Sequence, residues 1–106
     1  VDVNKRKMVL ANNTGGLSGP AVRPVALRMV YDVAGAVSIP VIGMGGVSCA
    51  DDVLEMMMAG ATAVAVGTAL FADPYTPLKV RDGLAVLAAR QGLAAVRELT
   101  GKVLPW

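Results

Sequence analysis

Histidine is absent from this 106-residue chain, cysteine occurs once, and aromatic residues make up only 4% of it. A single cysteine cannot form an internal disulfide, and without histidine the chain shows no local cluster with the spacing of metal ligands. Basic residues that are not interleaved with aromatic ones also lack the stacking surface of a single-strand binding groove. We therefore expect neither a metal site nor a nucleic-acid partner.

The chain also has little excess charge of either sign and no uninterrupted apolar run of membrane-spanning length. The net charge is +2, and the basic residues are scattered apart from residues 5–7. Residues 33–50 and 56–72 carry no charge and approach spanning length, but Pro40 in the first run and Gly60 in the second interrupt them. We expect no membrane segment. No basic-then-apolar signal opens the chain, so a cytoplasmic location is the expectation.

Hydrophobic residues make up 55% of the chain, which is typical of buried strands covered by helices. The pattern predicts alternating strands and helices, hence parallel strands in an α/β fold, either as a barrel arc or as half of an open sheet. Both strands are expected to be buried, and the wholly apolar one at 39–43 to be buried on both faces. In order, we expect a hairpin tip at 2–10, a loop at 12–20, a helix at 24–37, a strand at 39–43, a helix from 48 or 49 to 60, a strand at 61–66, helices at 78–90 and 93–99, and a tail at 104–106.

Three glycine-rich turns stand where a strand should meet a helix. They are the run Asn13–Ala21, the turn Gly43–Gly46 and the pair Gly67 and Thr68. Glycine lets backbone N–H groups approach an anion closely, and the Thr68 hydroxyl adds a further donor. The last two turns fall at the carboxyl ends of the strands, where barrel enzymes keep their sites. The alternative is that these glycines only make tight turns. The spacing of the last two turns also departs from the glycine motif of dinucleotide-binding folds.

Other side chains have structural explanations that we prefer. Cys49 begins a helix, where the dipole can activate a thiol, but no histidine supports it and a small residue beside the cap is expected. Asp51 and Asp52 are expected to be first-turn dipole partners. Arg23 and Arg28 could reach an anion, although solvated positions are expected. The methionines expected to fill gaps in the core are Met29, Met44, Met56, Met57 and Met58.

These segments resemble dihydroorotate dehydrogenase over most of the chain, namely at residues 13–28, 42–47 and 59–68. The sequence of residues 17–24, Leu-Ser-Gly-Pro-Ala-Val-Arg-Pro, is similar to that of the B-type class 1 enzymes. These enzymes are catalytic subunits that pair with an iron-sulfur FAD electron-transfer subunit. The resemblance implies the C-terminal part of an FMN-binding (β/α)8 TIM barrel. In that barrel a base removes the C5 proton of dihydroorotate and hydride passes from C6 to flavin N5, giving orotate for pyrimidine biosynthesis.

The resemblance also implies which residues touch FMN: Gly19, Gly45, Gly46, Gly67 and Thr68, the last four around the phosphate. The family's catalytic cysteine, its flavin-contacting lysine and the asparagines that bind orotate correspond to segments before Val1, and Cys49 does not replace them. We therefore expect residues 1–106 to be a single partial domain, the last third of the barrel, with no catalytic residue and no activity alone.

Two other readings stay open. The FMN domain of dihydropyrimidine dehydrogenase has a similar loop and first helix. The other reading is a non-catalytic, phosphate-binding half-barrel that assembles with copies of itself. Self-assembly is expected because uncovered parallel strands expose apolar edges and faces. A homo-oligomer is expected in either case.

Overall fold

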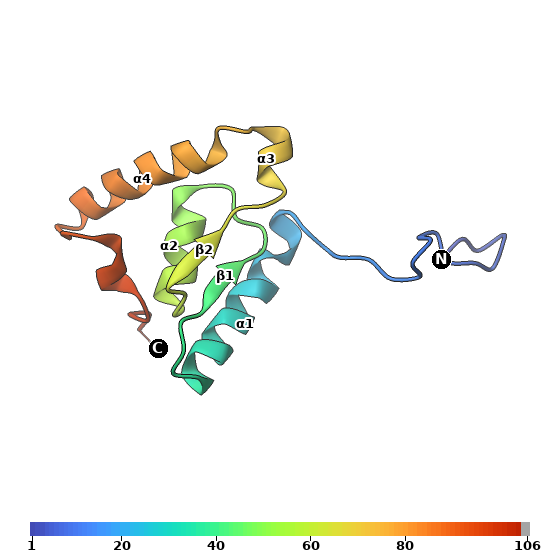
Figure 1. The fold of residues 1–106 in the computed structure, drawn as a ribbon, viewed down its shortest axis with the longest axis horizontal. Helices are drawn as coiled ribbons and strands as arrows, with labels where there is room; N and C mark the ends of the chain where they lie inside the picture. Colours follow the sequence, from blue (N-terminus) through green and yellow to red (C-terminus); the bar gives the residue numbers. More distant parts are fainter. Residues whose placement is uncertain (105–106) are drawn as a thin grey trace.

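A two-stranded parallel sheet lies at the centre of the computed structural model, which describes residues 1–104. Strand β1 (Ile42–Met44) pairs with β2 (Ala63–Ala65), with Ile42 opposite Ala63 and Met44 opposite Ala65. Helix α2 (Ala50–Met58) connects the two strands (Figure 1). The predicted parallel strand–helix–strand order is confirmed, as two β/α units in sequence.

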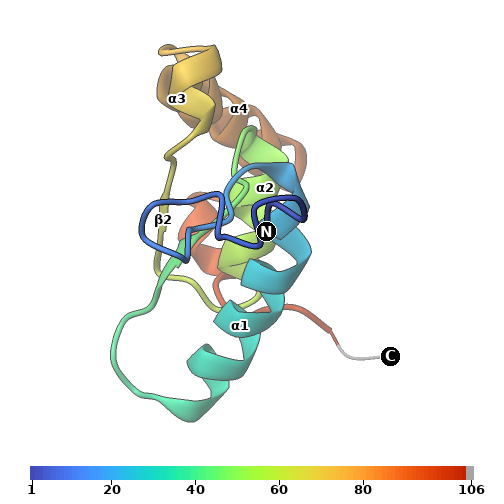
Figure 2. The ribbon, with the colours of Figure 1, turned by 90° about the vertical axis from the view of Figure 1, so that its right-hand side faces the viewer.

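The remaining elements surround this unit. Proline at the first or second position starts three of them, where its fixed φ suits a helix and its missing N–H is not needed. The five remaining elements are η1 (Pro20–Val22), α1 (Arg23–Ala36), α3 (Ala69–Ala72), α4 (Thr76–Arg90) and η2 (Val96–Leu99), and the three with proline at one of those positions are η1, α1 and α4. Figure 2 shows α1 and α2 on the same side of the strands. Figure 1 shows the N-terminal segment before η1 extending away from the body.

The core lies between these helices and the sheet. Met56 is fully buried, and Met57 is nearly so, which confirms the expected gap-filling role of these two residues. Met29 and Met44 are instead 63% and 59% exposed, so that expectation was wrong for them. The buried core cluster is Ala26, Val30, Val47, Val53, Met56, Met57, Ala61 and Val80.

The expectation that the first strand is buried on both faces and the second is buried was wrong. Gly43 is buried against Met56 and Ala61, whereas its neighbours Ile42 and Met44 are each 59% exposed. Side chains alternate across a strand, and helices cover only one face of this sheet, so every second residue faces away from the core. Among the described residues nothing covers that second face.

Element boundaries also differ from those expected. Both strands are shorter than predicted, at 42–44 rather than 39–43 and at 63–65 rather than 61–66. Helix α3 was not predicted, because four residues are too short to show a helical period. Only 96–99 of the stretch 93–99 is helical, and it is a 3₁₀ turn. The hairpin at 2–10 is reduced to one antiparallel bridge between Asp2 and Lys7. Of the tail at 104–106, residues 105 and 106 lie outside the described part.

Within residues 1–104, no helix is both long enough and apolar enough to cross a membrane.

Candidate functional site

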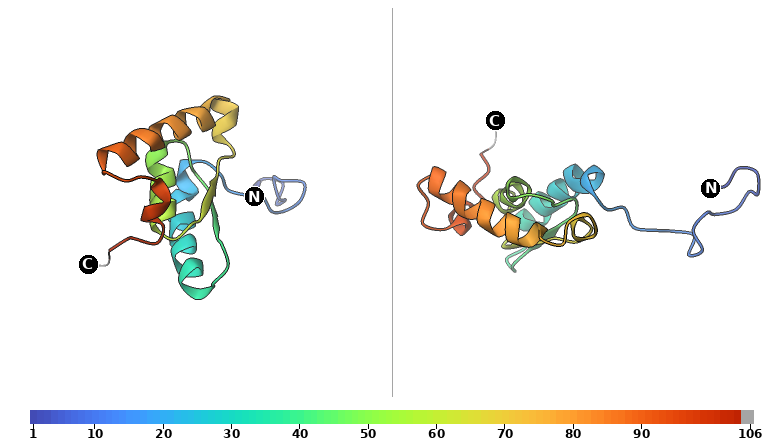
Figure 3. Two further views of the ribbon diagram at one scale, coloured as in Figure 1. Left: turned by 60° about the vertical axis from the view of Figure 1, so that its left-hand side comes forward. Right: turned by 90° about the horizontal axis from the view of Figure 1, so that it is seen from above.

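The three glycine-rich turns meet at one hollow of about 900 Å³. It lies at the carboxyl ends of β1 and β2, and residues of α1 and α3 contribute to its lining. Figure 3 (right) shows α3, in yellow, beside the start of α1, in blue. The five residues expected to bind a cofactor all line it: Gly19, Gly45, Gly46, Gly67 and Thr68. The carboxyl ends of parallel strands are where α/β proteins bind ligands.

Backbone conformation explains the glycines of the first two turns. Gly19, Gly45 and Gly46 have φ values of 85°, 119° and 71°, which side chains other than glycine rarely adopt. A Cβ on Gly46 would lie 2.7 Å from the Gly19 carbonyl oxygen and 2.8 Å from the Arg23 Cβ. The loop before α1 can therefore rest directly on the turn after β1 only because position 46 has no side chain.

Gly67 is different, because neither strain nor packing requires glycine there. Its φ lies outside the left-handed region, and an added Cβ would meet nothing within 4 Å. Since it lines the hollow, glycine at this position keeps the backbone accessible from the hollow. Gly16 shares both properties but does not line the hollow, which makes it a natural control.

Two of the turns present backbone donors that no loop carbonyl or side chain occupies. Within residues 1–104, the N–H groups of Gly46 and Thr68 donate no hydrogen bond to a loop carbonyl or to a side chain. No lysine or arginine lines the described hollow, so its donors to an anion are backbone N–H groups and hydroxyl groups such as that of Thr68. Free backbone N–H groups around a concave surface suit a phosphate group.

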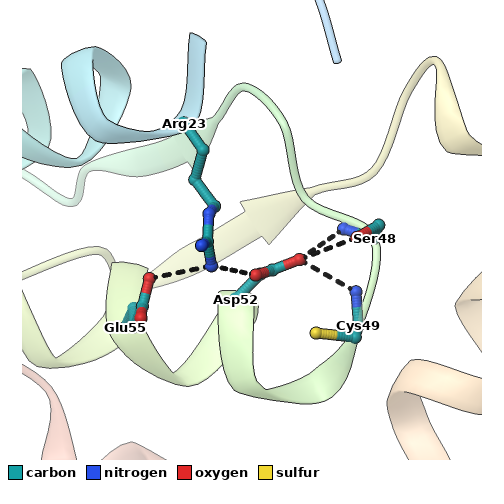
Figure 4. Close-up of polar contacts among 5 residues, drawn as sticks. All are labelled: Arg23, Ser48, Cys49, Asp52 and Glu55. Atoms are coloured by element: carbon teal, nitrogen blue, oxygen red, sulfur yellow. Dashed lines mark hydrogen bonds and ion pairs between the residues drawn. The ribbon is translucent and has the colours of Figure 1, made fainter. Parts of the chain in front are cut away.

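A polar cluster lies beside the turn after β1 (Figure 4). The Asp52 carboxylate accepts hydrogen bonds from Ser48 N–H at 2.8 Å, Ser48 Oγ at 2.9 Å and Cys49 N–H at 3.1 Å. Its other oxygen pairs with the guanidinium of Arg23, whose Nη1 also lies 3.1 Å from Glu55 Oε2. This cluster joins the start of α1 to the first turn of α2.

Asp52 is ionised at neutral pH. Burial raises its pKa, but the hydrogen bonds from Ser48 and Cys49 together outweigh burial and bring the pKa below its ordinary value. Because the pKa is lower in the folded protein, the ionised carboxylate stabilises the fold above the unfolded-state pKa of about 3.9. That contribution is lost as the pH falls through the lower folded-state value.

We expect Asp52→Asn to lower the stability at neutral pH and to flatten its acid dependence. The asparagine cannot be ionised, so the free energy of unfolding should fall less steeply below about pH 4 than in the wild type. Urea unfolding at several pH values measures this slope. Ser48→Ala, which removes one donor, should give an intermediate slope, and equal slopes in all three proteins would contradict the assignment.

The other candidate side chains have structural roles. Cys49 is a free, exposed cysteine that caps α2 as expected, and Asp51 and Asp52 occupy the first turn of that helix. Arg28 pairs with Asp32 at 2.7 Å on the exposed face of α1 and lies away from the hollow. Arg23 was expected to be solvated, but it is half-buried and paired instead. No group of three metal-ligating side chains occurs in the described residues.

Fold and site together define a parallel α/β protein with a glycine-lined hollow at the carboxyl ends of its strands. A family model described as "Dihydroorotate dehydrogenase" matches residues 1–87. The chain belongs to the dihydroorotate dehydrogenase family.

Individual relatives agree with this membership. The catalytic subunit of dihydroorotate dehydrogenase B (NAD(+)) from Geotalea uraniireducens is 54% identical over 104 residues, covering 98% of this chain and 34% of that subunit. Its counterpart from Enterococcus faecalis is 52% identical over 103 residues, with 97% and 33% covered. The chain thus spans about a third of the length of the curated relatives it matches. The expected likeness to B-type catalytic subunits is confirmed.

Solved structures give the same fold. The structure of dihydroorotate dehydrogenase from Eimeria tenella in complex with ferulenol superimposes with a TM-score of 0.78 at 28% identity. It covers 84% of this chain, while this chain covers 24% of that one. The expected fold class, part of the TIM barrel of this family, is confirmed.

The sequence analysis did not predict the ion pair between Arg23 and Asp52. Arg23 and Asp52 are 29 residues apart, and no local pattern signals that they pair. The available signal was indirect, since Arg23 follows one glycine turn by four residues and Asp52 follows another by six.

Proposed function

We propose that this chain is the phosphate-binding third of an FMN-dependent dihydroorotate dehydrogenase of the B type. The whole enzyme would oxidise dihydroorotate to orotate in pyrimidine biosynthesis. The observation that carries the proposal is the convergence of all three glycine-rich turns on one hollow, in a chain of this family.

The residues fit an FMN phosphate. The N–H groups of Gly46 and Thr68 would hold the phosphate oxygens, while Gly67 leaves room for the phosphate to approach and Gly19 and Gly45 shape the turns around it. Leu17, Met29 and Met44 line the same hollow and offer apolar contact to the rest of the cofactor. When bound, FMN supplies the acceptor for hydride from the substrate.

Three further expectations follow from the proposal. No residue of this chain corresponds to the family's catalytic cysteine, so residues 1–106 supply cofactor binding alone and are inactive in isolation. The relatives are named as catalytic subunits, which supports an iron-sulfur FAD electron-transfer partner. Ile42 and Met44 face away from the helices and are exposed, which supports self-association unless further chain covers them.

The experiment that tests this function uses the complete gene product that contains these residues. We expect the purified protein to release FMN on denaturation and its bound flavin to be bleached by dihydroorotate in the absence of oxygen. Retention of flavin without bleaching by dihydroorotate would contradict the assigned substrate. A colourless product that binds no added FMN would contradict the cofactor.

Replacing Gly67 with alanine should weaken FMN binding without affecting the fold. Gly67 lines the hollow, and the added methyl group would meet no protein atom within 4 Å, so stability should stay within about 0.5 kcal/mol of the wild type. The affinity for FMN should fall about tenfold, corresponding to about 1.4 kcal/mol. Fluorescence titration of the apoprotein measures the affinity. Gly16→Ala, equally unhindered but outside the hollow, should leave both quantities unchanged.

A further inference from the structure

The Arg23–Asp52 ion pair connects two of the glycine turns. Arg23 opens α1, four residues after Gly19, and its backbone N lies 3.1 Å from the position that a Gly46 Cβ would take. Its side chain crosses to α2 and pairs with Asp52 (Figure 4). The loop that carries Gly19 is thus tied at its end to a different helix.

Asp52 also holds the residues that follow the Gly46 turn. The carboxylate oxygen that is not turned toward Arg23 accepts hydrogen bonds from the N–H groups of Ser48 and Cys49, which follow Gly46 by two and three residues. One carboxylate therefore fixes the chain on both sides of the contact between Gly19 and Gly46. A change in this pair alters the relative position of the two turns.

We propose that Arg23 and Asp52 are positioning residues that set the spacing of the Gly19 and Gly46 turns and thereby select a flavin that carries a phosphate. This inference rests on the proposed function, since it concerns the same hollow. Arg23 is not among the residues that line the hollow, so it acts through the turns and does not bind the anion itself.

Burial separates this pair from the surface pairs of the chain. The Asp52 side chain is 7% exposed and that of Arg23 is 34% exposed, whereas the side chains of Asp32 and Arg28 are 53% and 75% exposed. Removing one partner of a buried pair leaves the other uncompensated, which costs far more than breaking a solvated pair. Both arginines lie on α1, and either can be replaced with the same loss of charge.

The test measures flavin specificity in the apo form of the complete gene product. FMN and riboflavin differ by the phosphate, so the ratio of their dissociation constants reports on the phosphate end alone. We expect Arg23→Met to lower the preference for FMN about tenfold, that is by about 1.4 kcal/mol, with little change for riboflavin. Arg28→Met removes the same charge from the same helix and should leave the ratio unchanged.

Two further variants keep the result decisive. Arg23→Lys retains the positive charge and should restore most of the preference, while Arg23→Gln keeps a polar contact to Asp52 and should lower it by a smaller factor than methionine. If Arg23→Met fails to fold, an unchanged ratio in Arg23→Gln overturns the proposal. Equal weakening of both flavins, or an equal loss of preference in Arg28→Met, also overturns it.

Failure of this inference is distinguishable from failure of the proposed function. If Gly67→Ala lowers the FMN preference and the Arg23 variants do not, the phosphate site stands and the positioning role is wrong. If the wild-type protein does not prefer FMN to riboflavin at all, the proposed function itself is contradicted.

Discussion

The Gly46→Ala variant is expected to bind FMN about a hundredfold more weakly than the wild type, because two separate penalties, of about 1–3 kcal/mol each, act at this position. Alanine is strained at a φ of 71°, and its Cβ would lie 2.7 Å from the Gly19 carbonyl oxygen. Relief of that overlap requires the Gly19 loop to move away from the turn that carries the proposed phosphate donors. Fluorescence titration with FMN, together with thermal unfolding, measures both consequences.

Gly92→Ala is the matched control for backbone strain. Gly92 has a φ of 68°, close to that of Gly46, but an added Cβ there meets nothing within 4 Å and the residue lies away from the hollow. This variant should lose about 1 kcal/mol of stability and keep its affinity for FMN. Similar FMN affinities in the two variants would show that the contact between Gly19 and Gly46 is not needed for binding.

Gly60→Ala is expected to lower the free energy of unfolding by about 4 kcal/mol, the largest stability effect of any single methyl group in this chain. Gly60 follows α2 with a φ of 123°, and its Cβ would lie 2.4 Å from the Cβ of Ala34 in α1. The end of α2 and the end of α1 can approach each other only because position 60 lacks a side chain. Urea unfolding of the gene product measures the change.

A double variant separates the steric part of this effect from the conformational part. Ala34→Gly alone should cost about 1 kcal/mol, because glycine is unfavourable within a helix. Combined with Gly60→Ala it removes the overlapping atom, so the double variant should be more stable than the sum of the single changes predicts. Strict additivity would contradict the close approach of the two helices.

The sequence predicted the parts of this fold that depend on local signals. Pro24 marks the first turn of α1, Asp51 and Asp52 mark that of α2, and Gly60 marks its end, and all three signals were correct. The last two glycine turns were placed correctly at strand ends, because glycine is required by backbone conformation at positions 45 and 46. These are properties of a few neighbouring residues. The run Asn13–Ala21 was also expected to follow a strand, but no strand precedes it within the described residues.

The parts that failed depend on contacts distant in sequence. Ile42 and Met44 were expected to be buried because an apolar run resembles a doubly covered strand, but burial of the second face depends on what packs there. The Arg23–Asp52 pair arises only when α1 crosses α2. The convergence of the turns on one hollow was expected from parallel topology, whereas their contact with FMN stays a prediction.

The central claim is that these turns hold the phosphate of FMN, and a crystal structure of the complete gene product with FMN bound tests it most directly. Phosphate oxygens are predicted to lie about 2.7–3.2 Å from the backbone nitrogens of Gly46 and Thr68. A phosphate bound elsewhere, with these two N–H groups facing solvent, would contradict the account.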